Sequence, residues 1–184
     1  PNYNYDIDIN KKIKLHNIKS LIFLIKLFDE IKIKRIYGKK DKISFSGIFA
    51  KYVKKNNNTV LQSLSMLRDK GLINPNYNYD IDINKKIPVF SGLGGGSSNS
   101  ATIIKYFLNK KKLSKKELEY FSSQIGSDLK LFFQSNQLLQ KNLKKIVNIK
   151  KKKYFYFIIV YPFFKCSSKE IYSKVKSYNI IKSN

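Results

Sequence analysis

Four of the eight glycines in this chain fall within five positions, at 92, 94, 95 and 96, inside the stretch SGLGGGSSNS. Glycine lets a backbone approach a ligand closely, and a loop of this kind between a strand and a helix directs successive N–H groups toward one point. The helix that follows adds unpaired N–H groups and the positive end of its dipole. The stretch therefore predicts a cradle for a phosphate group.

A flexible linker is the alternative interpretation, because Gly/Ser-rich segments behave as coil. The strand expected before the stretch and the helix expected after it favour the cradle. Neither common phosphate motif fits, since a Walker loop would need Lys after Gly96 and the dinucleotide pattern would need Gly at position 97, which is Ser97. Ser98 can offer its hydroxyl to a phosphate oxygen or to Mg²⁺.

Two side chains elsewhere could also do chemistry. Asp128, in the sequence GSD, is the only aspartate after Asp82 and stands before an apolar run. By residue type alone it is more often a helix or turn cap than a general base, and both roles stay open. His16 is the only histidine, for which an ordinary surface position is the alternative to ligand binding.

The formal net charge of +25 raises the question of nucleic-acid binding. The positive side chains are almost all lysine, with Arg35 and Arg68 the only arginines, whereas recognition of bases and bidentate contact with phosphates depend on arginine. Lysine accompanies abundant Ile and Asn throughout the chain, as drift toward A/T-rich codons would produce. We therefore favour solvated lysines over a nucleic-acid-binding module, which stays an alternative.

Cys166 is the only cysteine, so no disulfide can form within the chain and a reducing compartment is expected. The longest apolar run, 154–164, is about half the length of a membrane-spanning helix and contains Pro162. The polar start PNYNYDIDIN lacks the features of a signal peptide. We expect a cytoplasmic protein without membrane association.

Start and stop residues locate the elements that would position these groups. Asn57 or Asn58 can cap a helix that Gly71 ends, and Ser114 with Glu117 forms a capping box. The irregular alternation of strands and helices predicts an α+β fold. Strands are expected within 15–38, at 43–47, 77–85 and 154–161, and helices at 60–70, 98–108, 114–124 and after a second capping box at 167–170.

The thirteen residues PNYNYDIDINKKI occur twice, at 1–13 and at 75–87. Two perfect copies indicate a recent duplication, an artificial addition or a sequence-assembly join, because repeat architectures contain many diverged copies. The second copy has the better context, since its alternating apolar residues predict a half-buried strand that leads into the glycine-rich stretch.

The residues IPVFSGLGGGSSNSA at 87–101 resemble the second signature of the GHMP kinase superfamily. Three further stretches are similar to this family in order and spacing, at 15–33, 124–133 and 158–172. The resemblance implies a GHMP-kinase N-terminal domain of the ribosomal-protein-S5-domain-2-like fold at 1–148, followed at 149–184 by the incomplete start of a ferredoxin-like C-terminal domain. Because that second domain closes over the site in the family, we expect nucleotide binding without complete turnover.

The same resemblance implies transfer of phosphate from ATP, with Mg²⁺, to a hydroxyl of a cytidine-diphosphate-linked methylerythritol. Asp128 would be the catalytic base and Ser98 a Mg²⁺ ligand, whereas His16, Phe163 and Phe164 would contact the cytosine. Another small-molecule kinase of the superfamily, of the homoserine or mevalonate type, is the alternative. The ATP-binding residues would be Pro88, Val89, Phe90, Ser91, Gly92, Leu93, Gly94, Gly95, Gly96, Ser97, Ser98 and Asn99.

Three positions depart from the family pattern. Leu15 stands where the family has a tyrosine that stacks on the cytosine, and Lys130 stands where it has proline. The family also supplies a catalytic lysine from a first strand, and the KIKL at 12–15 is too close to the following stretch for us to assign it. Without that lysine, stabilisation of the developing charge would be impaired.

Overall fold

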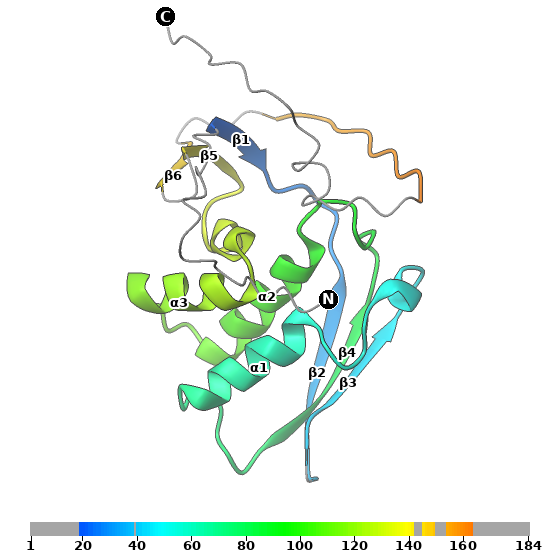
Figure 1. Ribbon diagram of the computed structural model, residues 1–184, viewed down its shortest axis with the longest axis vertical. Helices are drawn as coiled ribbons and strands as arrows, with labels where there is room; N and C mark the ends of the chain where they lie inside the picture. The colour runs from blue at the N-terminus through cyan, green and yellow to red at the C-terminus, as the bar shows by residue number, and fades with distance from the viewer. Residues whose placement is uncertain (1–18, 39, 142–144, 150–153, 164–184) are drawn as a thin grey trace, which may run out of the picture.

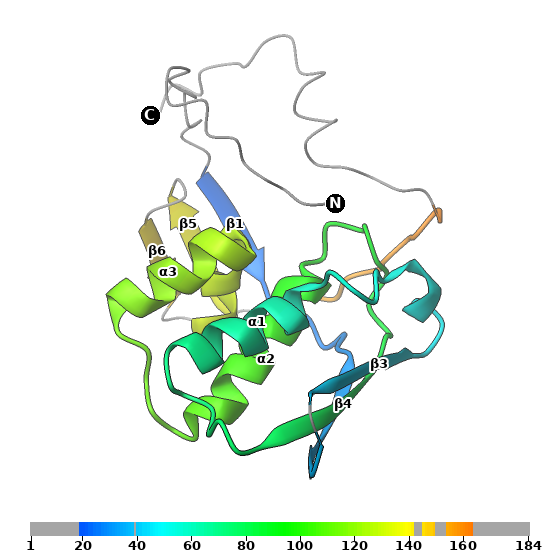
Figure 2. The same cartoon turned by 60° about the horizontal axis from the view of Figure 1, so that its bottom comes forward.

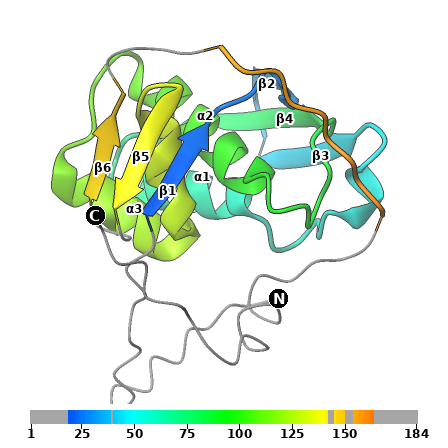
Figure 3. The same cartoon turned by 90° about the horizontal axis from the view of Figure 1, so that it is seen from above.

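The computed structural model describes residues 19–38, 40–141, 145–149 and 154–163. These residues form two three-stranded sheets at opposite ends of the molecule, with α-helices packed between and beside them (Figures 1 and 3). The expected mixture of helices and strands is confirmed. Residues 1–13, the first copy of the repeat, and the helix expected after 167–170 lie outside the described residues.

The larger part of the core rests on the sheet of order β2-β4-β3, in which β4 pairs antiparallel with β2 and parallel with β3. Ile81 and Ile83 of β4 are fully buried, and the isoleucines opposite them on β2 continue the apolar face. The alternation predicted for the second repeat copy is therefore confirmed. The strands are β2 (Glu30–Ile36), β3 (Lys42–Ser46) and β4 (Asn78–Asn84).

The second sheet has the order β1-β5-β6, and both of its pairings are antiparallel. Its first strand comes before the described helices in the chain, and its other two strands come after them. The sheet therefore pairs residues that lie on either side of the helical part of the chain. Its strands are β1 (Lys19–Phe23), β5 (Gln137–Lys141) and β6 (Lys145–Asn148).

The helices begin and end largely as their capping residues predict. The Asn58 side chain accepts hydrogen bonds from the N–H groups of Val60 and Leu61, and Gly71 ends α1 with a φ of +65°. Ser114 and Glu117 form the capping box of α3, and its hydrogen bonds lower the pKa of the Glu117 carboxyl. The helices are α1 (Thr59–Asp69), α2 (Gly95–Leu108) and α3 (Lys115–Ile125), with short 3-10 helices η1 (Ala50–Tyr52) and η2 (Ser127–Phe133).

Figure 2 shows α1 and α2 side by side against the sheet β2-β4-β3. The hydrophobic core lies where these elements meet, and α3 and η2 close it on the other side. The result is a rigid base directly beneath the glycine-rich stretch. Fully buried apolar residues from every layer contribute, among them Leu67, Ile81, Ile83, Ile103, Ile104, Phe121 and Leu129.

Two predicted elements differ from the structure. The helix after the glycine-rich stretch begins at Gly95 rather than at Ser98. Glycine has a low helix propensity, but this first turn packs closely on its neighbours: a Cβ on Gly95 would lie 3.0 Å from Ile87, and the Thr59 hydroxyl donates to the Gly96 carbonyl at 3.0 Å. The strand predicted at 154–161 is wrong, because residues 154–161 join no ladder with the described strands and lie along the surface.

Candidate active site

The loop between β4 and α2 is an ordered turn, not a slack linker. Three of its residues have left-handed backbone conformations, with φ of +63° at Phe90, +75° at Gly92 and +70° at Gly94. The Ser91 hydroxyl donates to the carbonyl of Pro88 at 2.8 Å and stabilises the turn. We call residues 88–98 the glycine loop.

The first turn of α2 presents its backbone N–H groups at the end of this loop. The first intrahelical hydrogen bond runs from the Ser98 N–H to the Gly94 carbonyl at 2.8 Å. The N–H groups of Gly95, Gly96 and Ser97 therefore have no partner within the helix, as at every helix N-terminus. Such groups, together with the helix dipole, attract a phosphate.

Close contacts favour glycine at two positions of the loop. A Cβ on Gly94 would lie 3.0 Å from the Phe132 ring, and its left-handed backbone already disfavours other residues. A Cβ on Gly95 would lie 3.0 Å from the Ile87 side chain. The loop is thus pressed against the residues behind it, which fixes the direction of its N–H groups.

The glycine loop forms one wall of an open pocket of about 670 Å³. Gly92, Gly94 and Ser98 face it, and Asp128 reaches it from the first turn of η2. The structure thus brings together the loop and the carboxylate that the sequence singled out, thirty positions apart. An apolar wall completes the pocket, and it consists of residues from the β1–β2 connection and from the segment 154–163: Leu24, Ile25, Leu27, Phe28, Phe157, Ile158 and Ile159.

Asp128 is held beside the start of α2 by the turn that precedes it. Gly126 adopts a φ of +145°, and a Cβ at that position would lie 3.9 Å from the Ser97 hydroxyl. The cap of η2 is Gly126 and not Asp128, whose exposed carboxylate faces the pocket. The geometry therefore favours a chemical role for Asp128 over the capping role that the sequence left open.

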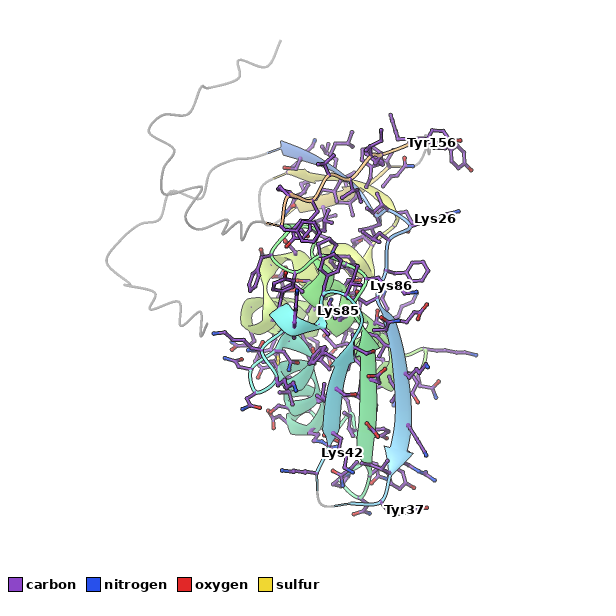
Figure 4. The ribbon with its side chains drawn as sticks, turned by 90° about the vertical axis from the view of Figure 1, so that its right-hand side faces the viewer. Lys26, Tyr37, Lys42, Lys85, Lys86 and Tyr156 are labelled. Carbon is purple, nitrogen blue, oxygen red and sulfur yellow. The ribbon has the colours of Figure 1, made fainter. Side chains whose placement is uncertain are left out.

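Sequence reasoning missed a buried polar cluster beneath the glycine loop. The Asp29 carboxylate pairs with the Lys85 ammonium and accepts a hydrogen bond from the Asn99 amide at 2.9 Å. The side chains of Asp29 and Lys85 are 0% and 5% exposed. Figure 4 shows Lys85 and Lys86 where the chain leaves β4, and only the second points to the surface, where it pairs with Glu30 at 2.5 Å. The sequence does not distinguish Lys85 from the many lysines of this chain that are expected to be solvated, so its burial could not be predicted.

Two lysines near the pocket already have partners within the protein. The Lys105 ammonium donates to the Phe132 carbonyl at 2.5 Å, and burial lowers its pKa. Lys130, which replaces the family's proline, is largely buried and pairs with Glu119 at 3.1 Å. The substitution is therefore accommodated by a salt bridge between η2 and α3.

The segment 154–163 crosses from the sheet β1-β5-β6 toward the glycine loop, as its orange trace in Figure 3 shows. The Tyr161 hydroxyl donates to the Val89 carbonyl at 3.1 Å, and its ring packs edge-on against Phe49. Phe163, one of the predicted cytosine contacts, is 72% exposed and stacks near Tyr161 at 5.0 Å between ring centroids. The other two predicted contacts, His16 and Phe164, lie outside the described residues.

Two features are absent from the residues that the structure describes. No helix there has both the length and the apolar character to cross a membrane. No group of three or more His, Cys, Asp or Glu side chains in that part of the chain could enclose a metal ion. A cation at this pocket would thus depend on a few protein oxygens and on its ligand.

Comparisons with known proteins agree with this geometry. Residues 58–131 match the family model described as the GHMP kinases N terminal domain. The chain is 40% identical over 171 residues to a 4-diphosphocytidyl-2-C-methyl-D-erythritol kinase of Pelagibacter ubique, an alignment that covers 92% of this chain and 60% of that protein. It is 32% identical over 183 residues to the kinase of the same name from Clostridium botulinum, which covers 95% of this chain and 62% of the relative.

The chain thus spans about 60% of the length of the curated relatives that it matches. Among solved structures, a homoserine kinase from Cytophaga hutchinsonii has a TM-score of 0.51 at 20% identity, with 66% of this chain and 42% of that chain covered. This likeness concerns the fold. The resemblance inferred from the glycine loop is confirmed, since residues 58–131 match the N-terminal domain of the GHMP kinases and the chain is similar over most of its length to two curated kinases.

Proposed function

We propose that this chain is the ATP-binding part of an enzyme that transfers the γ-phosphate of ATP to the 2-hydroxyl of 4-diphosphocytidyl-2-C-methyl-D-erythritol, a step of the non-mevalonate pathway to isoprenoid precursors. The observation that carries the proposal is the single pocket shared by the glycine loop and Asp128. Its volume of about 670 Å³ lies in the range of small-molecule sites. The names of the two relatives supply the acceptor.

In this proposal the glycine loop binds the phosphates of ATP. The N–H groups of the first turn of α2 point toward the site, and the helix dipole stabilises their negative charge. Phosphoryl transfer depends mainly on such positioning and charge stabilisation. The remaining loop residues from Pro88 to Leu93 carry the backbone past the phosphates, and the apolar wall opposite excludes water.

Asp128 acts as the general base. It accepts the proton of the acceptor hydroxyl, whose oxygen forms a bond to the γ-phosphorus while the bond from that phosphorus to the β,γ-bridging oxygen breaks, and ADP leaves. The carboxylate is exposed to the pocket, where it can reach the acceptor hydroxyl.

Mg²⁺ is proposed as the metal that accompanies ATP. Ser98 lines the pocket, and its hydroxyl is an oxygen donor of the kind that suits Mg²⁺, which is usually held by one or two protein ligands together with substrate phosphates. When bound, the ion would neutralise charge on the transferring phosphoryl group.

Recognition of the cytidine part rests on residues at the edge of the structure. Phe163 contacts the ring of Tyr161, which is hydrogen-bonded to Val89 of the glycine loop. We propose that Phe163 and Phe164 stack on the cytosine and that His16 donates a hydrogen bond to the base. We also propose that residues 149–184 begin a ferredoxin-like second domain and that the N-terminal domain has the ribosomal-protein-S5-domain-2-like fold. The charged substrates and the single cysteine fit the cytoplasm.

The test combines ATP with three acceptors: the cytidine substrate, homoserine and mevalonate. ADP release should occur with the cytidine substrate only, and Asp128→Asn should lower kcat by about 10²–10⁴-fold because a general base contributes that much. ATP affinity, measured by calorimetry, should change little in this variant. ADP release with homoserine or mevalonate instead would move the chain to another branch of the superfamily, and absence of ATP binding by the unaltered chain would remove the kinase proposal.

A further inference from the structure

We propose that the buried cluster of Asp29, Lys85 and Asn99 positions the glycine loop for the triphosphate by forming a charge-balanced floor beneath the first turn of α2. This inference rests on the proposed function, since it assigns positioning residues for the same ATP site. None of the three side chains is needed to touch the substrate, and each acts through the loop above it.

The Asp29 carboxylate is the centre of the cluster and accepts four hydrogen bonds. One of its oxygens accepts from the backbone N–H groups of Lys86 and Ile87, at 2.7 and 2.8 Å. The other accepts from the Asn99 amide at 2.9 Å and from the Lys85 ammonium. A carboxylate can accept about four hydrogen bonds, so every acceptor site of this buried charge has a donor from the protein.

These four bonds join the three segments that lead into the pocket. Asp29 stands at the end of the β1–β2 connection, whose preceding residues form the apolar wall. Residues 85–87 connect β4 to the glycine loop, and Asn99 is in the second turn of α2. A displacement of any one segment would break bonds to the same carboxylate. The cluster therefore fixes the loop relative to both of its neighbours.

The Lys85 ammonium lies directly below the start of α2. A Cβ placed on Gly95 would be 3.5 Å from its nitrogen. Without this cation, the Asp29 charge would face the same N–H groups that are to receive phosphate, and it would repel the ligand. With it, the helix N-terminus keeps its positive potential for the triphosphate.

Stability alone does not account for a buried ion pair at this place. Desolvation of two charges offsets most of their attraction, so apolar residues of similar volume would stabilise the fold as well or better. A fixed network of hydrogen bonds, in contrast, specifies one geometry. The glycine loop needs a fixed geometry, and the cluster lies directly beneath it. We therefore assign the cluster a positioning role.

Lys86 supplies a matched control one residue along the chain. Its ammonium pairs with Glu30 at 2.5 Å, but both side chains are nearly half exposed, at 45% and 49%. Lys86→Met removes the same charge as Lys85→Met without disturbing the buried cluster. ATP affinity should stay within about twofold in this control, because exposed pairs contribute little.

The experiment measures ATP affinity by calorimetry and amide exchange of residues 92–98 in each variant. Lys85→Met should weaken ATP binding by about tenfold or more and raise exchange in the loop, since an unpaired buried charge remains. The double variant Asp29→Asn with Lys85→Met should recover most of the affinity, because it removes both charges. Equal affinities in Lys85→Met and Lys86→Met, or no recovery in the double variant, would overturn the inference.

Asn99→Asp keeps the test decisive if the lysine variant does not fold. The new carboxylate at position 99 would repel that of Asp29, so the pKa of one carboxyl of this pair rises in the variant, and both are ionised only at the higher pH. At pH 7.5 the variant should bind ATP more weakly than the unaltered chain, and the ratio of the two affinities should return toward one as the pH falls to about 5.5. At the lower pH the protonated carboxyl donates to Asp29, as the amide does. A ratio independent of pH would contradict the positioning role.

Failure of this inference is distinguishable from failure of the proposed function. If the unaltered chain does not bind ATP, the kinase proposal falls, yet amide exchange of residues 92–98 still shows whether the cluster orders the loop. If the chain binds ATP and exchange in these variants equals that in Lys86→Met, the ATP site stands and the positioning role is refuted.

Discussion

The glycine loop is held from beneath by buried polar groups, whereas the opposite wall of the pocket is held by aromatic contacts near the surface. Under the loop, the fully buried Asp29 side chain accepts hydrogen bonds from two segments, residues 85–87 and α2. Across the pocket, Phe23 of β1 contacts Phe155 and Phe157, with ring centroids 4.9 and 5.7 Å apart. Both of these partners are about half exposed.

This contrast follows from what each wall has to do. A phosphate site requires N–H groups at fixed directions, and directional hydrogen bonds with tight packing supply that precision. An apolar wall needs only shape and the exclusion of water, which non-directional contacts supply. Alternate residues of the segment 154–160 face outward and are almost fully exposed, including Tyr156, which Figure 4 shows pointing away from the molecule. The two walls should therefore respond differently to mutation.

The largest effect is expected at Gly94, on the rigid wall. Gly94→Ala should destabilise the fold by about 2–3 kcal/mol, because a left-handed backbone disfavours alanine and the new methyl group would meet Phe132 at 3.0 Å. ATP affinity should fall by about tenfold or more as the first turn of α2 shifts. Chemical denaturation and calorimetry measure the two quantities.

Gly92 provides the control for this prediction. Its φ of +75° imposes the same backbone strain, but no atom lies within 4 Å of an added Cβ. Gly92→Ala should therefore cost about 1–2 kcal/mol, the strain alone. If the two alanine variants lost equal stability, close packing against Phe132 would not be what fixes the loop.

A smaller effect is expected at Phe23, which holds the apolar wall. Phe23→Ala removes two ring contacts and should destabilise the fold by about 1–2 kcal/mol. Proteolysis within 154–163 should become faster, while the affinity for inorganic triphosphate, which needs only the glycine loop, should stay within about twofold. Val147→Ala on the same sheet is the matched control. A loss of triphosphate affinity in Phe23→Ala would show that the two walls are coupled.

The sequence predicts the rigid wall far better than the apolar one. The glycine loop, the strand before it and the capping residues of α1 and α3 are local signals, because each depends on residues within a few positions. The predicted start of α2 was wrong, because Gly95 and Gly96 were counted as loop, whereas in the structure Gly95 packs near Ile87 and the Gly96 carbonyl accepts a hydrogen bond from Thr59. Local propensity alone therefore gave a helix three residues too short.

The parts that sequence reasoning missed depend on contacts between distant segments. Asp29 and Lys85 are fifty-six positions apart, and nothing in either neighbourhood distinguishes them from the many solvated charges of this chain. The apolar run at 154–161 has the composition of a strand, yet β-propensity describes packing against neighbours, and this segment joins none of the described strands. The resemblance to the GHMP kinases placed Asp128 in the site, which its local sequence could not do.

The smallest effect is expected where the two walls meet, at the hydrogen bond from the Tyr161 hydroxyl to the Val89 carbonyl. Tyr161→Phe keeps the ring against Phe49 and removes only this bond, so it should cost about 1 kcal/mol and lower Tm by about 2–4 °C. Tyr156→Phe, at a fully exposed position of the same segment, should change Tm by less than about 1 °C. Because Val89 is part of the glycine loop, amide exchange at 88–91 should rise in the first variant only. Equal exchange in both variants would mean that the buried cluster alone orders the loop, and that the apolar wall contacts the loop without stabilising it.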